Sequence, residues 1–259
     1  MIGDSVVGVL PAAGLASRLR PFRYPKELLP VAYEVEGEDA GALRPRAVVE
    51  YSVAALVRAG VPRCVAVVAP WKLDVVRYLG GGEDLGISMS YVLQEEARGL
   101  PWAVDLAYPW TGGCDVVMVL PDTVIRPPDF LATTLRRHQE SGADLTLAVF
   151  PTTEPQRLGP VVHQGGVVTA VVDKPARAPA DNTWGAAVWG PAFSELLHLA
   201  VVESPADAGE MPLGNCFQAA VDKGLDVRAV DVDGSFCDVG TPRGLGTVLA
   251  AGHPVGGAR

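Results

Sequence analysis

The stretch VVGVLPAAGLASRLRPFRYPKELLPV, residues 6–31, decides the fold that this sequence predicts. It begins with the apolar run Val6–Pro11 and continues into the small residues Ala12–Gly14, a pattern typical of a buried strand that ends in a tight turn. Small residues let the backbone approach a ligand and direct its N–H groups toward it. Arg18 and Lys26 follow on a proline-stiffened loop, where they offer a guanidinium fork and an ammonium to a phosphate. We therefore expect a phosphate-binding loop after the first strand.

This loop matches neither of two common nucleotide motifs. The pattern GxxxxGK[ST] of a P-loop is absent, and so is the GxGxxG fingerprint of dinucleotide-binding proteins. An ordinary loop with two solvent-facing cations is the simpler interpretation, and this segment alone leaves it open.

Apolar runs of the same kind recur along the first half of the chain. They occupy residues 63–70, 88–94, 115–122 and 143–151. Helical patterns separate them, at about residues 46–59, 71–79, 100–110 and 129–141. Alternating strands and helices predict an α/β fold with a Rossmann-like, mixed but mostly parallel sheet flanked by helices. Ligands bind beyond the carboxyl ends of such strands, so Ala12–Gly14 and Asp122 should meet at one edge.

The pattern changes after Pro151. A hairpin is expected to turn at Gly165–Gly166, and the strand TWGAAVWG leads to a helix that starts at Pro191. A helix at about residues 214–223, a strand at 225–232 and a last helix after Thr241 complete the chain. We expect a small mixed α/β lobe on the edge of the sheet. The prediction is one domain over residues 1–259, with halves at about 1–151 and 152–245.

Composition limits the function classes. The chain has 259 residues, of which 49% are hydrophobic and 20% charged, and this composition excludes a disordered protein or a coiled coil. Apolar runs shorter than the ~18 residues of a membrane span, and an N-terminus unlike a signal peptide, predict a cytoplasmic protein without a membrane partner. The net charge of -9 argues against nucleic acid and, at first sight, against polyanionic substrates. The cysteines and histidines match no metal-ligand spacing, and the histidines are expected on the surface or in loops.

Four other segments carry side chains suited to chemistry. Asp122 in VMVLPDT follows a buried strand, where its carboxylate suits Mg²⁺, although a turn or helix-cap role fits it equally well. Asp238 lies in SFCDVGTPRGL, where it is typical of a turn before a helix unless the fold brings it close to Asp122. Asp173-Lys174 ends a strand of the hairpin, where the alternative is an edge strand stopped by a proline. Gln94 ends a strand, and its side-chain amide suits the edge of a nucleobase.

Taken in order, these segments resemble the sugar-1-phosphate nucleotidyltransferases, the family of glucose-1-phosphate uridylyl- and thymidylyltransferases. The family motif L-A-G-G-x-G-T-R-L-x-P…P-K-x-L-L-P-V is matched by LPAAGLASRLRP at 10–21 and PKELLPV at 25–31. The remaining family motifs Q-x-x-P-x-G-L-A, G-D, E-K-P and W-x-D-x-G-T-P correspond to Gln94 through Gly99-Leu100, to Asp122, to Asp173-Lys174-Pro175 and to FCDVGTP at 236–242. The likeness covers about residues 6–245.

The resemblance implies a nucleotide-diphospho-sugar transferase fold and a function. A nucleoside triphosphate would be coupled to a sugar 1-phosphate with release of pyrophosphate, through Mg²⁺-assisted in-line attack on the α-phosphate. A pyrimidine nucleotide is favoured, and a homo-oligomer is open. The implied roles are catalysis for Arg18, Lys26 and Lys174, nucleotide binding for Ala12, Ala13, Gly14, Gln94 and Gly99, acceptor binding for Asp173, Lys174 and Gly185, and metal binding for Asp122 and Asp238.

The sequence departs from the family pattern at several positions. Ala16, Pro101 and Pro121 replace two glycines and an alanine, Asp173 replaces glutamate, and the acidic motif near Glu210 is incomplete. Two alternatives follow from these departures. The acceptor could be a non-sugar phosphate or phosphonate, such as a cyclitol phosphate or choline phosphate. The chain could also be a non-catalytic, nucleotide-binding relative.

Overall fold

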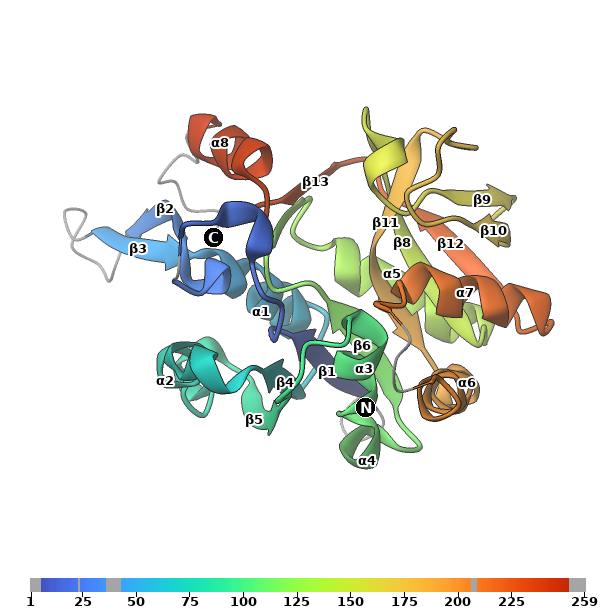
Figure 1. Cartoon of the computed structure of the whole chain (residues 1–259), viewed down its shortest axis with the longest axis horizontal. Helices are drawn as coiled ribbons and strands as arrows, with labels where there is room; N and C mark the ends of the chain where they lie inside the picture. The colour runs from blue at the N-terminus through green and yellow to red at the C-terminus, as the bar shows by residue number, and fades with distance from the viewer. Residues whose placement is uncertain (1–5, 23, 36–42, 206–208, 252–259) are drawn as a thin grey trace.

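The fold is built on one large sheet, seen edge-on across the middle of the computed structural model (Figure 1). The structure describes residues 6–22, 24–35, 43–205 and 209–251. The nine strands of the sheet lie in the order β5 (Ser88–Leu93), β4 (Arg63–Val68), β1 (Val6–Pro11), β6 (Asp115–Val119), β11 (Asn182–Trp189), β8 (Leu145–Pro151), β12 (Val227–Asp231), β10 (Val167–Val171) and β9 (Val161–Gln164).

Strands β11 and β10 run against the other strands of this sheet. The predicted mixed, mostly parallel sheet is therefore confirmed. The strands expected in a small lobe after Pro151 extend the same sheet, because β11 pairs along its length with both β6 and β8. The predicted hairpin turn at Gly165–Gly166 joins β9 to β10.

Helices cover both faces of the sheet, as the unbroken apolar runs require. Successive side chains of β1 enter opposite layers: Val6 and Leu10 face one core, while Val7 and Val9 face the other. The first core is closed by α1 (Val48–Arg58), α2 (Leu73–Leu79) and α5 (Phe130–Ser141). The second is closed by α3 (Leu100–Asp105), α4 (Tyr108–Thr111), α6 (Pro191–Val202) and α7 (Leu213–Asp222).

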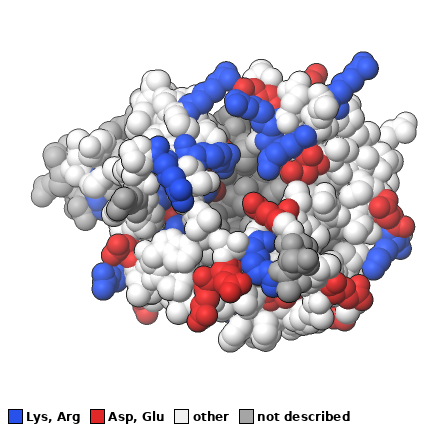
Figure 2. All heavy atoms as spheres, in the orientation of Figure 1, with Lys and Arg blue, Asp and Glu red and all other residues white. Residues whose placement is uncertain are grey.

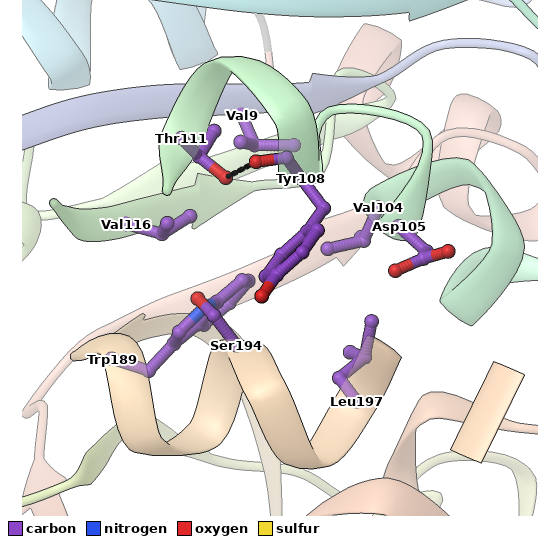
Figure 3. A pocket seen from close by; sticks show the side chains of 9 residues that line it. All are labelled: Val9, Val104, Asp105, Tyr108, Thr111, Val116, Trp189, Ser194 and Leu197. Carbon is purple, nitrogen blue, oxygen red and sulfur yellow. Dashed lines mark hydrogen bonds between the residues drawn. The ribbon is translucent and has the colours of Figure 1, made fainter. Parts of the chain in front are cut away.

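Packing between α3, α4 and α6 leaves almost no space. Their interface encloses a cavity of about 10 Å³, into which Tyr108 points from α4 toward the side chains of α6 (Figure 3). Such a volume holds one water molecule at most. The Tyr108 ring stacks on His198 at 4.4 Å, and Asp105 binds the same imidazole at 2.9 Å. These contacts join α3 and α4 to α6 within the second helical layer.

Two small sheets lie beside the large one. β2 (Pro30–Val35) pairs with β3 (Leu43–Ala47), and β7 (Thr123–Arg126) pairs with β13 (Ser235–Asp238), which leads into α8 (Pro242–Ala250). A third apolar cluster, which includes Val31, Val48, Val124 and Val239, joins them to α1. None of the helices in the described ranges is long and apolar enough to cross a bilayer.

Candidate active site

A cleft of about 580 Å³ opens beyond the carboxyl ends of β1 and β6, as predicted for this kind of sheet. Both halves of the chain line it. On the face shown in Figure 2, basic side chains gather around a central hollow and acidic side chains lie next to them. The predicted site residues that line the cleft are Ala13, Gly14, Arg18, Lys26, Gln94, Gly99, Asp122, Asp173, Lys174 and Asp238.

The β7–β13 pair brings Asp122 and Asp238 together. The register of the two strands places Thr123 opposite Asp238, so Asp122 lies beside the end of β13. Gly240 lies between the two carboxylates: a Cβ atom on this residue would be 2.8 Å from Asp238 Oδ1 and 3.0 Å from Asp122 Oδ2. The absence of a side chain at Gly240 leaves the space in which both carboxylates face each other.

This pair of carboxylates fits Mg²⁺. Magnesium usually keeps several water ligands, and proteins bind it through one or two carboxylates together with substrate phosphates. The described residues form no group of three or more metal-binding side chains, so a cage made of protein alone is not available in this part of the chain. Two aspartates open to a cleft are the donor set expected of a metal shared with phosphates.

A cation faces each aspartate. Lys26 Nζ contacts Asp122 Oδ2, and Arg18 Nη2 lies 3.1 Å from Asp238 Oδ2. Burial alone would raise the pKa of Asp122, but the charge and the hydrogen bond of Lys26 outweigh it and lower the pKa. Burial raises the pKa of Asp238, and the negative charge of Asp122 raises it further. The two carboxylates repel each other and are compensated by Arg18 and Lys26.

The wall that is predicted to bind nucleotide is lined by Ala13, Gly14, Gln94 and Gly99. Gly14 and the buried Ala13 follow β1, and Gln94 follows β5 with only 5% of its surface exposed. Gly99 has a φ of 102°, and a Cβ atom there would lie 2.9 Å from Glu210 Cγ. Glycine is needed at this position for both reasons.

Ala12 differs from its two neighbours, because it does not line the cleft. Its N–H donates to the carbonyl of Val67 at 2.7 Å, and its carbonyl accepts from Lys72 Nζ at 2.9 Å. Both of its backbone polar groups are thus occupied within the protein. A direct contact between Ala12 and a nucleotide, expected from the sequence, gains no support from this geometry.

Asp173 and Lys174 follow β10 on the opposite wall. Lys174 adopts a φ of 43°, and its N–H donates to the carbonyl of Leu158 at 2.8 Å. Its ammonium is 3.7 Å from Asp173 Oδ2, and 67% of its side chain is exposed. The backbone of this lysine is thus held in place, while its exposed ammonium, beside Asp173, can meet an anion in the cleft.

Gly185 does not line the cleft. A Cβ atom on it would lie 2.7 Å from the ring of Phe236 and 2.8 Å from the ring of Phe150. Packing of these aromatic rings against β11 gives a structural reason for the glycine. Its predicted contact with an acceptor stays a prediction.

The lining residues that were not predicted include Arg157, Trp184 and Phe236. Trp184 packs edge-on against Phe217 at 5.2 Å, and its buried Nε1 has no hydrogen-bond partner. Phe236 matches the tryptophan of the family motif W-x-D-x-G-T-P, but only the aspartate of this segment was predicted to have a role. Trp184 directly precedes Gly185, and this position could have indicated that it lines the cleft. No motif marks Arg157.

Ala16 shows how the loop accommodates a departure from the family pattern. Its φ of 51° and ψ of 30° lie in the left-handed region, where a Cβ atom is unfavourable. The loop therefore follows a path suited to glycine although it carries alanine. Ser17–Leu19, the short 3-10 turn that follows, places Arg18 on the cleft.

Comparisons with known proteins identify the family of the chain. A family model described as nucleotidyl transferase matches residues 7–251. The chain is 26% identical over 243 residues to a low-salt glycan biosynthesis nucleotidyltransferase of Haloferax volcanii, covering 92% of this chain and 63% of that protein. It is 28% identical over 233 residues to a glucose-1-phosphate thymidylyltransferase of Streptomyces griseus, covering 88% and 61%. The chain thus spans about three fifths of the length of these two curated relatives.

Among solved structures, the fold is similar to that of a putative glucose-1-phosphate thymidylyltransferase from Bacillus anthracis in complex with sucrose. The TM-score is 0.84, the sequence identity is 19%, and the match covers 98% of each chain. At this identity the structural likeness establishes the fold alone. Together with the family model, which spans nearly the whole chain, it leads to one conclusion: the chain belongs to the nucleotidyl transferase family.

Proposed function

We propose that this protein transfers a nucleotidyl group from a nucleoside triphosphate to a sugar 1-phosphate, giving a nucleoside diphosphate sugar and pyrophosphate. The observation that supports it best is the convergence of two carboxylates and three cations in one cleft. Arg18, Lys26, Lys174, Asp122 and Asp238 come from distant parts of the sequence and line the same 580 Å³ space. The names of the relatives, which include glucose-1-phosphate thymidylyltransferases, agree with this assignment.

The chemistry requires positioning and charge neutralisation. An oxygen of the acceptor phosphate attacks the α-phosphorus, a P–O bond forms, and the bond to the leaving pyrophosphate breaks. A phosphate monoester already carries most of its second negative charge near neutral pH, since its second pKa is about 6. No general base is needed, so the protein contributes by aligning the two phosphates and stabilising their charge.

Each charged residue has a place in this scheme. Arg18 would hold the β- and γ-phosphates, Lys26 the triphosphate near its α-phosphate, and Lys174 the incoming phosphate. Asp122 and Asp238 would hold Mg²⁺, which supplies charge neutralisation to the phosphate oxygens when bound. Asp173 would contact the acceptor. Lys26 therefore exchanges its contact with Asp122 for a phosphate when substrate enters.

We propose a pyrimidine nucleotide as the donor. The side-chain amide of Gln94 lies buried in the wall of the cleft, where it can donate to and accept from the edge of a base. Gly99, on the same wall, allows close approach of the backbone. The likeness of residues 11–19 to uridylyl- and thymidylyltransferases supports the same preference.

Pyrophosphate release tests the proposal. Purified protein with Mg²⁺ is incubated with each nucleoside triphosphate and a panel of sugar 1-phosphates, and the nucleotide product is identified by mass spectrometry. We expect release with UTP or dTTP and a hexose 1-phosphate. Cyclitol phosphate and choline phosphate belong in the panel, because product formation with one of them alone would replace the sugar with that acceptor.

Matched variants connect the activity to the cleft. Lys26→Ala and Asp122→Asn should each lower kcat/KM by roughly 100-fold or more, the loss of one charged contact in the transition state. Lys223→Ala and Asp84→Asn change exposed residues outside the cleft and should leave activity unchanged. A protein that is silent across the whole panel, yet binds nucleotide, would instead be the non-catalytic relative.

A further inference from the structure

Lys72 is a buried lysine behind the proposed active site. It ends the 3-10 turn Pro70–Lys72 after β4, and only 4% of its side chain is exposed. Lysine is almost never buried to this extent unless its charge is paired. Its ammonium donates to Glu27 Oε1 at 2.7 Å and to the carbonyl oxygen of Ala12 at 2.9 Å. Neither Lys72 nor Glu27 is among the described residues that line the cleft.

The two acceptors of Lys72 stand at the two ends of one loop. Ala12 directly precedes residues 13–26, and Glu27 directly follows them. This loop carries Arg18 and Lys26, and its first residues form the nucleotide side of the cleft. A single ammonium therefore fixes the distance between the end of β1 and the short turn Lys26–Leu28. It closes the base of the loop from behind.

Two consecutive residues of that turn, Lys26 and Glu27, point to opposite sides of the loop. Lys26 points into the cleft, where it contacts Asp122, while Glu27 points away from it and is fully buried against Lys72. Because the two side chains leave the same short segment of backbone, the position of Lys26 Nζ depends on where Glu27 is anchored. The anchor reaches the reacting groups only through Lys26 and the residues after Ala12.

Stability gives a poor account of this pair. Burying two charges costs more than an apolar pair of similar volume in many proteins, and the second carboxylate oxygen of Glu27 is buried without a hydrogen-bond partner. Burial raises the pKa of Glu27 and lowers the pKa of Lys72, so each group relies on the other to remain charged. An arrangement that is costly to bury and tied to both ends of a functional loop indicates a role in geometry.

We infer that Lys72 and Glu27 are positioning residues, which together hold the loop 13–26 in the shape that receives a nucleoside triphosphate. They touch no substrate themselves. The inference rests on the proposed function for its effect on catalysis, and on the ion pair alone for its effect on the loop. Loss of the ion pair should therefore affect the binding of the triphosphate and not that of the acceptor, because Lys174, on the acceptor wall, belongs to another part of the chain.

Glu27→Gln is the main test, because glutamine keeps the shape and one acceptor oxygen while it removes the charge. Two readouts are used: hydrogen–deuterium exchange of peptides that cover residues 12–28 in the ligand-free protein, and KM for each substrate separately. We expect faster exchange in these peptides alone, and a KM for the triphosphate raised by about tenfold or more with the acceptor KM nearly unchanged. Glu203→Gln, on an exposed glutamate, is the matched control.

A charge-free pair separates positioning from folding. Lys72→Met leaves the Glu27 carboxylate buried without its cation and should lower the melting temperature, and Lys72→Met with Glu27→Leu should recover most of it. We expect the double variant to keep the raised KM for the triphosphate, with Lys223→Met as the control. Should this variant not fold, Glu27→Gln decides the question.

The inference is overturned if loop exchange in Glu27→Gln equals that of the wild type. It is also overturned if both KM values rise together, or if the double variant regains stability and triphosphate KM alike. Failure of the proposed function has a different signature, since it leaves the wild type inactive while the exchange experiment still reports on the loop.

Discussion

The backbone N–H of Val239 donates to the carbonyl oxygen of Asp122 at 3.0 Å. This bond continues the β7–β13 pairing beyond Asp238 and ties the two predicted metal aspartates to each other by main chain. Residues more than a hundred positions apart are thereby held without reliance on their own side chains. The backbone therefore sets where the two carboxylates lie.

Gly240→Ala should damage activity more than stability. The new Cβ atom would be 2.8 Å from Asp238 Oδ1, 3.0 Å from Asp122 Oδ2 and 3.2 Å from Arg18 Nη2, so all three charged groups must move. We expect kcat/KM to fall by roughly 100-fold, the scale of a displacement of about 1 Å in an active site. Gly246→Ala, in α8 with no atom within 4 Å of its Cβ position, is the control and should keep full activity. Equal activity of the two variants would contradict the prediction.

Ala16→Gly should stabilise the protein. The left-handed conformation at φ 51° costs a residue with a Cβ atom about 1 kcal/mol, and glycine adopts it freely. Urea unfolding should therefore show a higher midpoint with an unchanged slope. Ala251→Gly, at an ordinary φ of -66°, should give no gain. A destabilised Ala16→Gly protein would show that the loop has no strain to release.

Gly159→Ala should impair the acceptor side selectively, because it displaces Trp184, which directly precedes Gly185, the glycine predicted to contact the acceptor. Its Cβ atom would collide with Trp184 Nε1 and lie 2.7 Å from Trp184 Cδ1, which forces the indole to shift in the wall of the cleft. We expect the acceptor KM to rise by about tenfold, the scale of one misplaced methylene, while the triphosphate KM changes little. Gly209→Ala, with no atom within 4 Å of its Cβ position, is the matched control. A rise in the triphosphate KM alone would contradict the prediction, because it would indicate that Trp184 lies beside the triphosphate and not beside the acceptor.

Glu50 should make stability depend on pH. Its carboxylate accepts hydrogen bonds from Ala47 N–H at 2.8 Å, from Arg44 Nη2 at 2.7 Å and from Tyr78 at 2.6 Å. Burial raises the pKa of Glu50, but these hydrogen bonds outweigh it and lower the pKa below its ordinary 4.5. The stabilisation is therefore complete above pH 4.5 and is lost as pH falls through the lowered native pKa.

Glu50→Gln tests that dependence by urea unfolding. The variant should be less stable than the wild type by ~2 kcal/mol at neutral pH, and the difference should shrink as the pH falls below 4.5. Glu140→Gln, on an exposed carboxylate of α5, should show almost no difference at any pH. A difference for Glu50→Gln that does not change with pH would contradict the assignment.

The sequence predicted the sheet well, because strands buried on both faces leave unbroken apolar runs. It failed where a segment is ordered by a partner that its own residue pattern does not reveal. The pairing of β2 with β3 was not predicted: residues 33–35 end β2 and Leu43 begins β3, while residues 36–42 lie outside the described part. His138, expected near the surface, is buried in α5 against Thr146, since a single histidine shows no sign of the hydroxyl that will satisfy it.

The site divides in the same way. Motifs located the charged residues, whose chemistry restricts them to few alternatives, and the structure brings them together. Trp184 and Arg157 were missed, because wall residues need only shape and are set by packing across elements. Lys72 is one of few lysines in the sequence, but its hydrogen-bond acceptors could not be inferred. One of them is the carbonyl oxygen of Ala12, and every residue has a carbonyl oxygen.

The pairing of β11 with β6, from Ala186 opposite Val119 to Trp189 opposite Val116, has a consequence for turnover. The hydrogen bonds between β11 and β6 continue beneath the cleft. The two walls therefore cannot move apart as separate domains unless these hydrogen bonds break. Substrate and product must instead pass between the short loops at the edge of the cleft. Such loops move faster than whole domains close. For the proposed reaction, we therefore expect the movement of loops, and not the closure of whole domains, to admit the substrates.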